Sequence, residues 1–303
     1  MNPIEVFEIC KDASNKGIPT ELNNVIVPKL FCDGDYQLLW NDNSKKIRSL
    51  LDEIMCSEHP DLGLELLMRF GVFKALFPEI SAMYHLGDDQ KDLHKDVWEH
   101  TKAVVTGVPN TLELRYGALF HDVGKVKTRR FNAGRVTFHN HDRVGAKIVD
   151  SLNDRTKLFN DDVKLLRTVR ALVMQHLRPA NYNKNWTDSA VRRLITECGD
   201  VNFFQKLMYL SRSDLTTKNQ KKRARCIRNG DELEARVKRV IEIDNAPKLP
   251  KGTMGIILEA SGKKPGPWLN ILRIKLEELM KDGSIGVNES VTFYIELGMT
   301  LLD

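Results

Sequence analysis

The stretch LRYGALFHDVGKVKTRR, residues 114–130, decides how the rest of the chain is interpreted. Its first half has apolar residues at helical spacing, and Gly124 marks the end of that helix. His121 follows Leu114 by two helical turns, so it lies on the apolar face near the C-terminal end. His121 and Asp122 project about 100° apart, which lets both reach one ion at a helix end.

A second histidine lies on the apolar face of the preceding helix. Asp96 and Glu99 form an N-cap and N3 signature, which predicts a helix that begins at Val97. His100 shares one face of this helix with Val97 and Val104. We therefore expect the His100 imidazole to point into the core.

Two further ionisable residues continue apolar stripes. Asp214 follows Phe203, Leu207 and Leu210 on one helical face, so its carboxylate points inward and requires a cation. His176 continues a stripe in the same way, formed by Leu165, Val169, Leu172 and Val173. Since unpaired burial of such groups is costly, the pattern favours a shared site.

The residue types indicate which ion would bind. Imidazoles and carboxylates form a mixed nitrogen and oxygen shell, suited to Mn²⁺, Mg²⁺, Fe²⁺, Ni²⁺ or Zn²⁺. The five cysteines are far apart and never form CxxC, so neither a disulfide framework nor a thiolate zinc site is indicated. The alternative is ordinary: a single histidine on an apolar face is more often a hydrogen-bonded core residue, and His-Asp pairs occur by chance. The ordered set favours the metal site.

Length and composition are those of a globular protein. The 303 residues allow about two domains, with 42% hydrophobic and 29% charged residues. No apolar run approaches the roughly 20 residues that span a bilayer, and the start MNPIEVFEIC is acidic where a secretory signal is basic. We therefore expect a cytoplasmic protein without a membrane partner. Its oligomeric state does not follow from the sequence.

Positive charge is concentrated near the expected ligands. The net charge of +5 is mild. However, basic segments at 125–130 and 218–228 follow the His-Asp pair and Asp214 directly. Basic clusters are more often solvated surface, but this placement favours a phosphate-bearing substrate and predicts RNA or tRNA binding through these segments.

The predicted fold class is all-α, in three modules: 1–57, 58–230 and 231–303. One stretch, residues 130–139, has a glycine turn and β-branched residues and predicts a loop or small hairpin. The apolar spacing predicts helices near 3–15, 44–56, 64–70, 97–105, 112–120, 142–152, 165–176, 189–196, 201–210, 231–243 and 268–281.

The order His, His-Asp, distant Asp resembles the HD superfamily of metal-dependent phosphohydrolases. A closer resemblance is to the neck, body and tail of bacterial CCA-adding enzymes, the tRNA nucleotidyltransferases. It is carried by NPIEVFEICKDASNKGI (2–18), PDLGLELLMRFGVFKALFPEI (60–80), DVWEHT (96–101), LRYGALFHDVGKVKTRR (114–130), RVTFHNHDRVGAKIVDSL (135–152), SRSDLTTK (211–218) and KLPKGTMGIILEASGKKPGPWLNILRIKLEEL in the tail.

This resemblance implies an HD-domain helical bundle at 58–230, preceded by a neck-like helical module and followed by a helical tail. It implies metal ligation by His100, His121, Asp122 and Asp214, with Asp122 central to catalysis. His141 and His176 occupy places where two-metal HD proteins carry further ligands. Phosphate contact is implied for Lys125 and suggested for Arg178. For His139, His141, His176 and Arg178, polar loop or helix-end roles remain the alternative.

Two departures from the CCA-adding pattern limit what the resemblance implies. The polymerase head that precedes the neck in that family is not part of this sequence. In the neck, Glu5, Glu8 and Lys11 stand where the family has arginines that bind the incoming nucleotide. Reversed charge at two of these places would repel a triphosphate. We therefore expect this polypeptide alone not to add nucleotides.

Three functions remain open at this stage. The first is metal-dependent hydrolysis of nucleotide or RNA-end phosphoesters, either 2′,3′-cyclic phosphodiesters or phosphomonoesters, through a metal-activated water. A second is a tRNA- or RNA-binding module whose metal is structural or vestigial. The third is nucleotidyl transfer with a head supplied by a separate chain, against which the altered neck argues.

Overall fold

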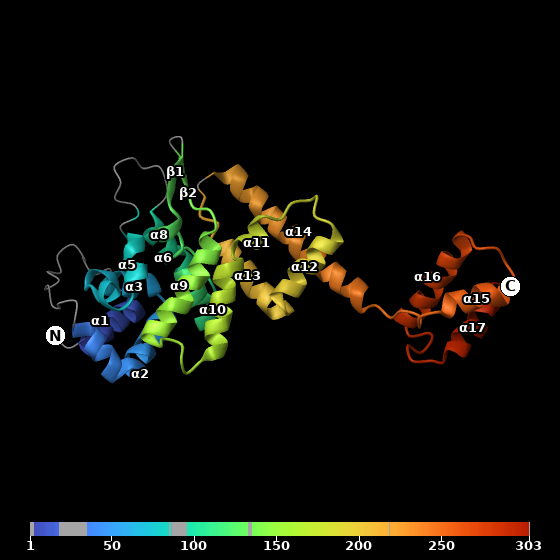
Figure 1. Cartoon of the computed structure of the whole chain (residues 1–303), viewed down its shortest axis with the longest axis horizontal. Helices are drawn as coiled ribbons and strands as arrows, with labels where there is room; N and C mark the ends of the chain where they lie inside the picture. Colours follow the sequence, from blue (N-terminus) through green and yellow to red (C-terminus); the bar gives the residue numbers. More distant parts are fainter. Residues whose placement is uncertain are drawn as a thin grey trace. The chain divides into compact units, whose positions relative to one another are not determined.

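The computed structural model describes residues 3–17, 35–84, 86, 96–132, 135–217 and 219–302. Within these ranges the chain is helical apart from two short strands, which confirms the predicted all-α class (Figure 1). The chain divides into two compact units, residues 1–234 and 235–303. The predicted module boundaries after residues 57 and 230 stay predictions.

The first unit begins with short helices that form its N-terminal part. Helix α1 packs on α2 and α3, and α3 packs on α6, which carries His100. Trp98 on α6 is fully buried and meets Phe73 edge-to-face at 5.8 Å between ring centroids. The bounds are α1 (Pro3–Lys16), α2 (Asp35–Met55), α3 (Pro60–Arg69), α4 (Val72–Leu76), α5 (Pro78–Tyr84) and α6 (Val97–Gly107).

The centre of the first unit is a packed group of helices around α7 and α10. These two approach closely at Gly117, where a Cβ atom would lie 2.8 Å from Leu172 Cδ1. Helix α13 packs on α6, α7 and α10, and α9 packs on α10. The bounds are α7 (Leu112–Phe120), α8 (Lys125–Thr128), α9 (His141–Thr156), α10 (Val163–Gln175), α11 (Leu177–Ala180), α12 (Asp188–Cys198) and α13 (Val201–Ser213).

The predicted hairpin within 130–139 is confirmed. Strands β1 (Arg130–Asn132) and β2 (Arg135–Thr137) pair antiparallel, with Phe131 opposite Val136. In Figure 1 the two strands, in green, form an arm that stands out from the helices beyond α8.

Helix α14 (Gln220–Asn245) is longer than predicted. The predicted helix near 231–243 begins at Gln220, so residues 220–228 of the basic segment 218–228 are helical; Lys218 lies outside the described residues. Lysine and arginine are good helix formers, and Gly230 is tolerated within the helix at a cost of about 1 kcal/mol.

The second unit has its own small core. Ile257, Leu272 and Leu276 form it, from α15 (Thr253–Ser261) and α16 (Pro267–Lys281). Helix α16 confirms the helix expected near 268–281, whereas α15 and α17 (Val291–Thr300) were not predicted. Among the described helices of the whole chain, none has the length and apolar character needed to cross a membrane.

Candidate metal centre

Three helices of the first unit direct their C-terminal ends at one place. His121, His176 and Asp214 are the C-cap residues of α7, α10 and α13. The last turn of a helix exposes unpaired carbonyls and carries partial negative charge. The backbone therefore favours a cation here before any side chain is considered.

The other three expected ligands reach the same place from α6, α9 and the turn after α7. His100 lies in the first half of α6, where Asp96 caps the helix by accepting from the amides of Trp98 and Glu99. His141 is the first residue of α9, and Asp122 follows the end of α7 directly. Six side chains predicted from separate segments are thus brought together.

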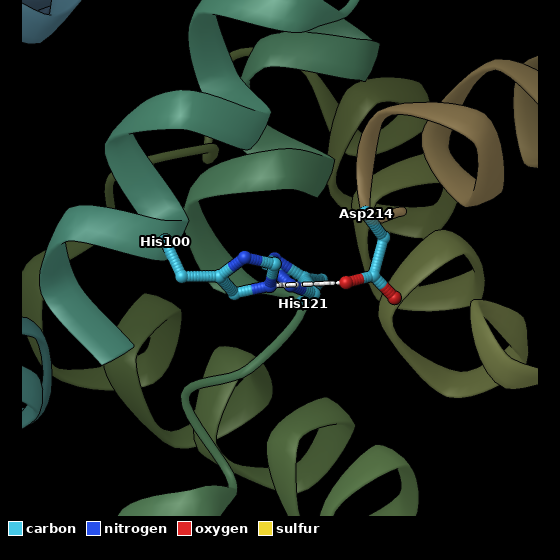
Figure 2. A group of neighbouring side chains, drawn as sticks. All are labelled: His100, His121 and Asp214. Carbon is cyan, nitrogen blue, oxygen red and sulfur yellow. Dashed lines mark hydrogen bonds and ion pairs between the residues drawn. The ribbon is translucent and has the colours of Figure 1, made fainter. Parts of the chain in front are cut away.

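One triad consists of His100, His121 and Asp214. The two imidazole Nε2 atoms are 3.3 Å apart, and Asp214 Oδ1 lies 3.0 Å from His100 Nε2 and 3.7 Å from His121 Nε2. Figure 2 shows both rings and the carboxylate pointing toward one another.

Asp122, His141 and His176 form a second triad beside the first. Its two Nε2 atoms are 3.1 Å apart, and Asp122 Oδ1 is 3.4 Å from His141 Nε2. The other oxygen of Asp122, Oδ2, lies 3.3 Å from His121 Nε2 and 3.5 Å from His100 Nε2. Asp122 therefore faces both triads, one with each carboxylate oxygen.

The opposite ring nitrogens are fixed by local hydrogen bonds. In His121, His141 and His176, Nδ1 donates to the carbonyl three residues earlier, at 2.7, 2.8 and 2.7 Å. In His100, Nδ1 contacts Thr216 Oγ1 at 3.0 Å. Because a carbonyl only accepts, Nδ1 carries a proton in each of the first three rings, and whenever such a ring is neutral its lone pair lies on Nε2.

This donor set fits a divalent ion. In the His141–His176 pair both lone pairs lie on the facing Nε2 atoms, which cannot form a hydrogen bond with each other, so this pair requires a shared positive group. Nitrogens bound at about 2.1 Å to one ion, at angles near 90–110°, lie roughly 3.0–3.4 Å apart. The two Nε2 pairs, at 3.3 and 3.1 Å, match this spacing. Backbone acceptors behind the rings are the usual outer partners of metal-binding histidines.

Burial and charge keep the carboxylates ionised. Burial raises the pKa of Asp214, but the hydrogen bond from His100 and the charge of His121 outweigh it and lower the pKa to about 2. Burial likewise opposes ionisation of Asp122, yet His121 and Lys125 hold its pKa well below the usual range. Burial and the nearby His121 lower the pKa of His176 to about 4, so this ring is neutral at pH 7.

The centre is closed on one side and open on the other. Asp122 has 2% of its side chain exposed, whereas Asp214 has 27%. Lys125 pairs its ammonium with Asp122 Oδ2 and lies over the Phe138 ring, 5.6 Å from the centroid. A substrate can therefore approach from the side of Asp214.

Arg178 does not join this cluster. Its guanidinium pairs with Glu197 of α12, near the surface. The suggested phosphate contact of Arg178 stays a prediction, and this ion pair argues against it. His139 is exposed in the turn before α9.

Gly124 positions α8 against α9. A Cβ atom on Gly124 would lie well inside contact distance of the His141 carbonyl oxygen and 2.7 Å from the Gly145 amide nitrogen. Only glycine permits this approach, which sets Lys125 beside the first turn of α9.

The sequence did not reveal the groups that orient the rings. Thr216, two residues after Asp214, and the carbonyls of Ala118, Phe138 and Val173 were missed. The carbonyls of Ala118 and Val173 could have been found, because a C-cap histidine lies three residues beyond an open last-turn carbonyl. Nothing in the sequence marks Thr216.

Comparison with known proteins gives two family matches. Residues 95–236 match the HD domain, and residues 48–84 match a family described as "Probable RNA and SrmB- binding site of polymerase A". The first match contains all six residues of the two triads.

Two curated relatives are tRNA nucleotidyltransferases. Over 262 residues, 83% of its length, the chain is 28% identical to the CC-adding tRNA nucleotidyltransferase of Thermus thermophilus. Over 140 residues, 44% of its length, it is 34% identical to the A-adding tRNA nucleotidyltransferase of Deinococcus radiodurans. The matches cover 56% and 31% of these relatives, so the chain spans about half of the first and a third of the second.

Proposed function

We propose that this chain, which contains an HD domain and is homologous over that region to tRNA nucleotidyltransferases, hydrolyses phosphoesters of nucleotides or RNA ends with a divalent ion. The observation that carries the proposal is the convergence of four Nε2 atoms and two carboxylates in the two triads. Such a centre suits phosphoryl chemistry, because the transferred group carries negative charge that must be balanced.

Each side chain has a defined task in this proposal. The six ligands would hold the ion, and the C-terminal helix ends and two carboxylates would keep that position favourable for positive charge. When bound, the ion supplies Lewis acidity and acidifies a water molecule at neutral pH. Lys125 would neutralise charge on the phosphoryl oxygens. The exposed side of Asp214 would admit the ester.

The proposed substrates are 2′,3′-cyclic phosphates, 2′-nucleotides and related phosphomonoesters. The relatives act on tRNA according to their names, which supports a nucleotide or RNA end as the natural ester. The exposed basic residues of α8 and α14 fit the same polyanionic class.

The test compares two aspartates that differ in placement. Protein supplied with Mn²⁺, Ni²⁺ or Mg²⁺ should hydrolyse 2′,3′-cyclic AMP or a p-nitrophenyl phosphate ester, and Asp122→Ala should lose at least about a hundredfold in kcat/KM. Asp150→Ala is the control. Asp150 lies on α9, and its exposed side chain pairs with Arg170 of α10. Turnover that survives both chelation and Asp122→Ala would reject the proposal.

A second candidate function is RNA binding with a structural ion. Residues 48–84 match an RNA-binding family, and Lys221, Lys222, Arg225 and Arg228 surround an open pocket of about 450 Å³ on α14. Basic groups that bind RNA phosphates make affinity fall with salt. Salt-dependent tRNA binding without turnover, unchanged in His121→Ala, would favour this function over hydrolysis.

A further inference from the structure

The β1–β2 arm is attached to the metal centre at both ends. On the entering side, α8 begins at Lys125, which pairs with Asp122, and β1 begins two residues after α8 ends. On the returning side, β2 ends at Thr137, and the next residue, Phe138, accepts the Nδ1 hydrogen bond of His141 at 2.8 Å. A group carried by this arm therefore has a fixed relation to the centre.

Phe131 is exposed on this arm. It has 63% of its surface exposed, more than any other large hydrophobic residue in the described part of the first unit. The Arg129 guanidinium lies over one face of its ring, 4.8 Å from the centroid. Because an aromatic ring has two faces, the ring can still accept a flat partner.

The surroundings of Phe131 carry positive charge. Arg129 and Arg130 directly precede it, and Lys125 and Lys127 lie on the helix just before the strand. Exposed aromatic rings set among cations are the usual arrangement for single-stranded nucleic acid, in which bases stack and phosphates pair with the cations. A purely apolar partner would make no use of these cations.

The distance between Lys125 at the metal centre and Phe131 on the arm suits one nucleotide or a short RNA end. Three helical and three extended steps separate Lys125 from Phe131, so their Cα atoms lie within roughly 15 Å. A phosphate at the centre and a base on the arm can thus belong to one terminal nucleotide or to its neighbour.

We propose that Phe131 is the stacking platform for the nucleobase of the phosphoester held at the metal centre. This inference rests on the proposed function and narrows it: the substrate class is a base-bearing ester, and the arm selects it over small alkyl phosphates. Phe131 is a positioning residue that contacts the base and not the reacting phosphorus.

Kinetics with paired esters test this platform. Phe131→Ala should raise KM for 2′-AMP roughly tenfold, as expected for one lost base stack, with kcat changed less than twofold. Glycerol 2-phosphate, an ester of similar type without a base, should be hydrolysed equally well by both proteins. Phe131→Tyr should restore the KM for 2′-AMP, and Phe131→Leu should not.

A matched control comes from α13. Tyr209 is also an exposed aromatic residue, with 48% of its surface exposed, and Tyr209→Ala should leave both esters unaffected. If Phe131→Ala and Tyr209→Ala behave alike toward 2′-AMP, the platform is wrong.

A binding measurement separates this inference from the hydrolase proposal. In Phe131→Trp, stacking of 3′-AMP should quench the added indole fluorescence, read as the difference from the parent protein. If turnover is lost in Asp122→Ala but unchanged in Phe131→Ala, the platform is rejected and the hydrolase proposal stands. Quenching without any turnover rejects hydrolysis and keeps the platform.

Two further readouts identify what covers the ring. The first compares the affinity for a short RNA with a 2′,3′-cyclic phosphate end and for 2′,3′-cyclic AMP, which tells whether the base belongs to an RNA end or to a free nucleotide. A loss of affinity for either ligand in Phe131→Ala supports the platform. A change in oligomeric state on gel filtration of Phe131→Ala, with nucleotide affinity unchanged, would show that a second copy covers the ring and would overturn the proposal.

Discussion

The Nε2 atoms of His141 and His176 face each other at 3.1 Å, while the Nδ1 atom of each ring donates to a backbone carbonyl. The orientation of both rings is thus set from behind by bonds that do not involve an ion. Two lone pairs at this distance repel each other unless a positive group lies between them. We infer that the fold presents both Nε2 atoms to one point, where a divalent ion would bind them.

A divalent ion should therefore stabilise the protein. At a concentration a hundred times its dissociation constant, an ion that binds only the folded chain contributes about 2.7 kcal/mol. For the first unit this corresponds to a rise in Tm of roughly 5–10 °C. Differential scanning fluorimetry with Mn²⁺, Ni²⁺ and Mg²⁺, followed by chelation, measures the shift.

His121→Ala should reduce that shift to near zero. The control is His59→Ala, because His59 lies before α3 and outside both triads. An equal shift in His121→Ala and the parent protein would contradict binding at these triads.

Thr216→Val should weaken ion binding without unfolding the chain. Valine keeps the shape of threonine but removes the oxygen that contacts His100 Nδ1 at 3.0 Å. Loss of such an outer partner typically costs about 10–100-fold in metal affinity. Isothermal titration calorimetry gives the affinity, and circular dichroism confirms the fold. Thr106→Val, at an exposed site on α6, should bind the ion as the parent does.

Gly124→Ala should destabilise the first unit and disturb His141. The added Cβ would collide with backbone atoms of His141 and Gly145, which cannot move aside as a flexible side chain can. We expect a loss of about 1–3 kcal/mol in unfolding free energy, together with weaker ion binding. Urea denaturation provides the measurement. Gly230→Ala, where the Cβ meets Met208 at an ordinary 3.5 Å, should be neutral or mildly stabilising.

Glu65 should contribute stability that is lost in acid. Burial opposes its ionisation, but hydrogen bonds from Lys102, Arg69 and Trp98 outweigh this and lower its pKa below the ordinary 4.5. A lowered folded-state pKa stabilises the folded state above the unfolded-state value, and this contribution fades as pH falls through the folded-state value. Glu65→Gln should cost about 2 kcal/mol at pH 7 and progressively less below pH 4.5.

Parallel urea titrations at pH 7 and pH 3.5 check the Glu65 prediction. Asp150→Asn, which removes an exposed pair with Arg170, should change stability by less than about 1 kcal/mol at either pH. A pH-independent cost of Glu65→Gln would show that the contribution is packing and not charge.

Helices with one clear apolar face were predictable from the sequence, as were the residues that lie on those faces. Asp96 marked the start of α6. Gly124, expected to stop the helix before it, instead caps the start of α8, because α7 already ends at Phe120. Periodicity places a side chain on a face, but it does not say which faces meet. The grouping into two triads, with Asp122 between them, required the packing of α6, α7, α9, α10 and α13.

Helices without separate apolar and polar faces were not predicted correctly. Helices α15 and α17 are apolar on nearly every side, so no period distinguishes them from strands or loops. Helix α14 is polar on nearly every side, so no apolar stripe marked its first turns and its start was missed. The partner of Arg178 could not be predicted, because Glu197 is nineteen residues away and belongs to another helix.

Because Gly124 packs directly on the first turn of α9, Lys125 and His141 are held together by that backbone contact and not by the hairpin that joins them along the chain. The hairpin can therefore gain, lose or exchange residues while the ligands keep their mutual positions. Among related proteins, changes in the arm would therefore alter which ester is preferred, while the ion-binding residues stay the same.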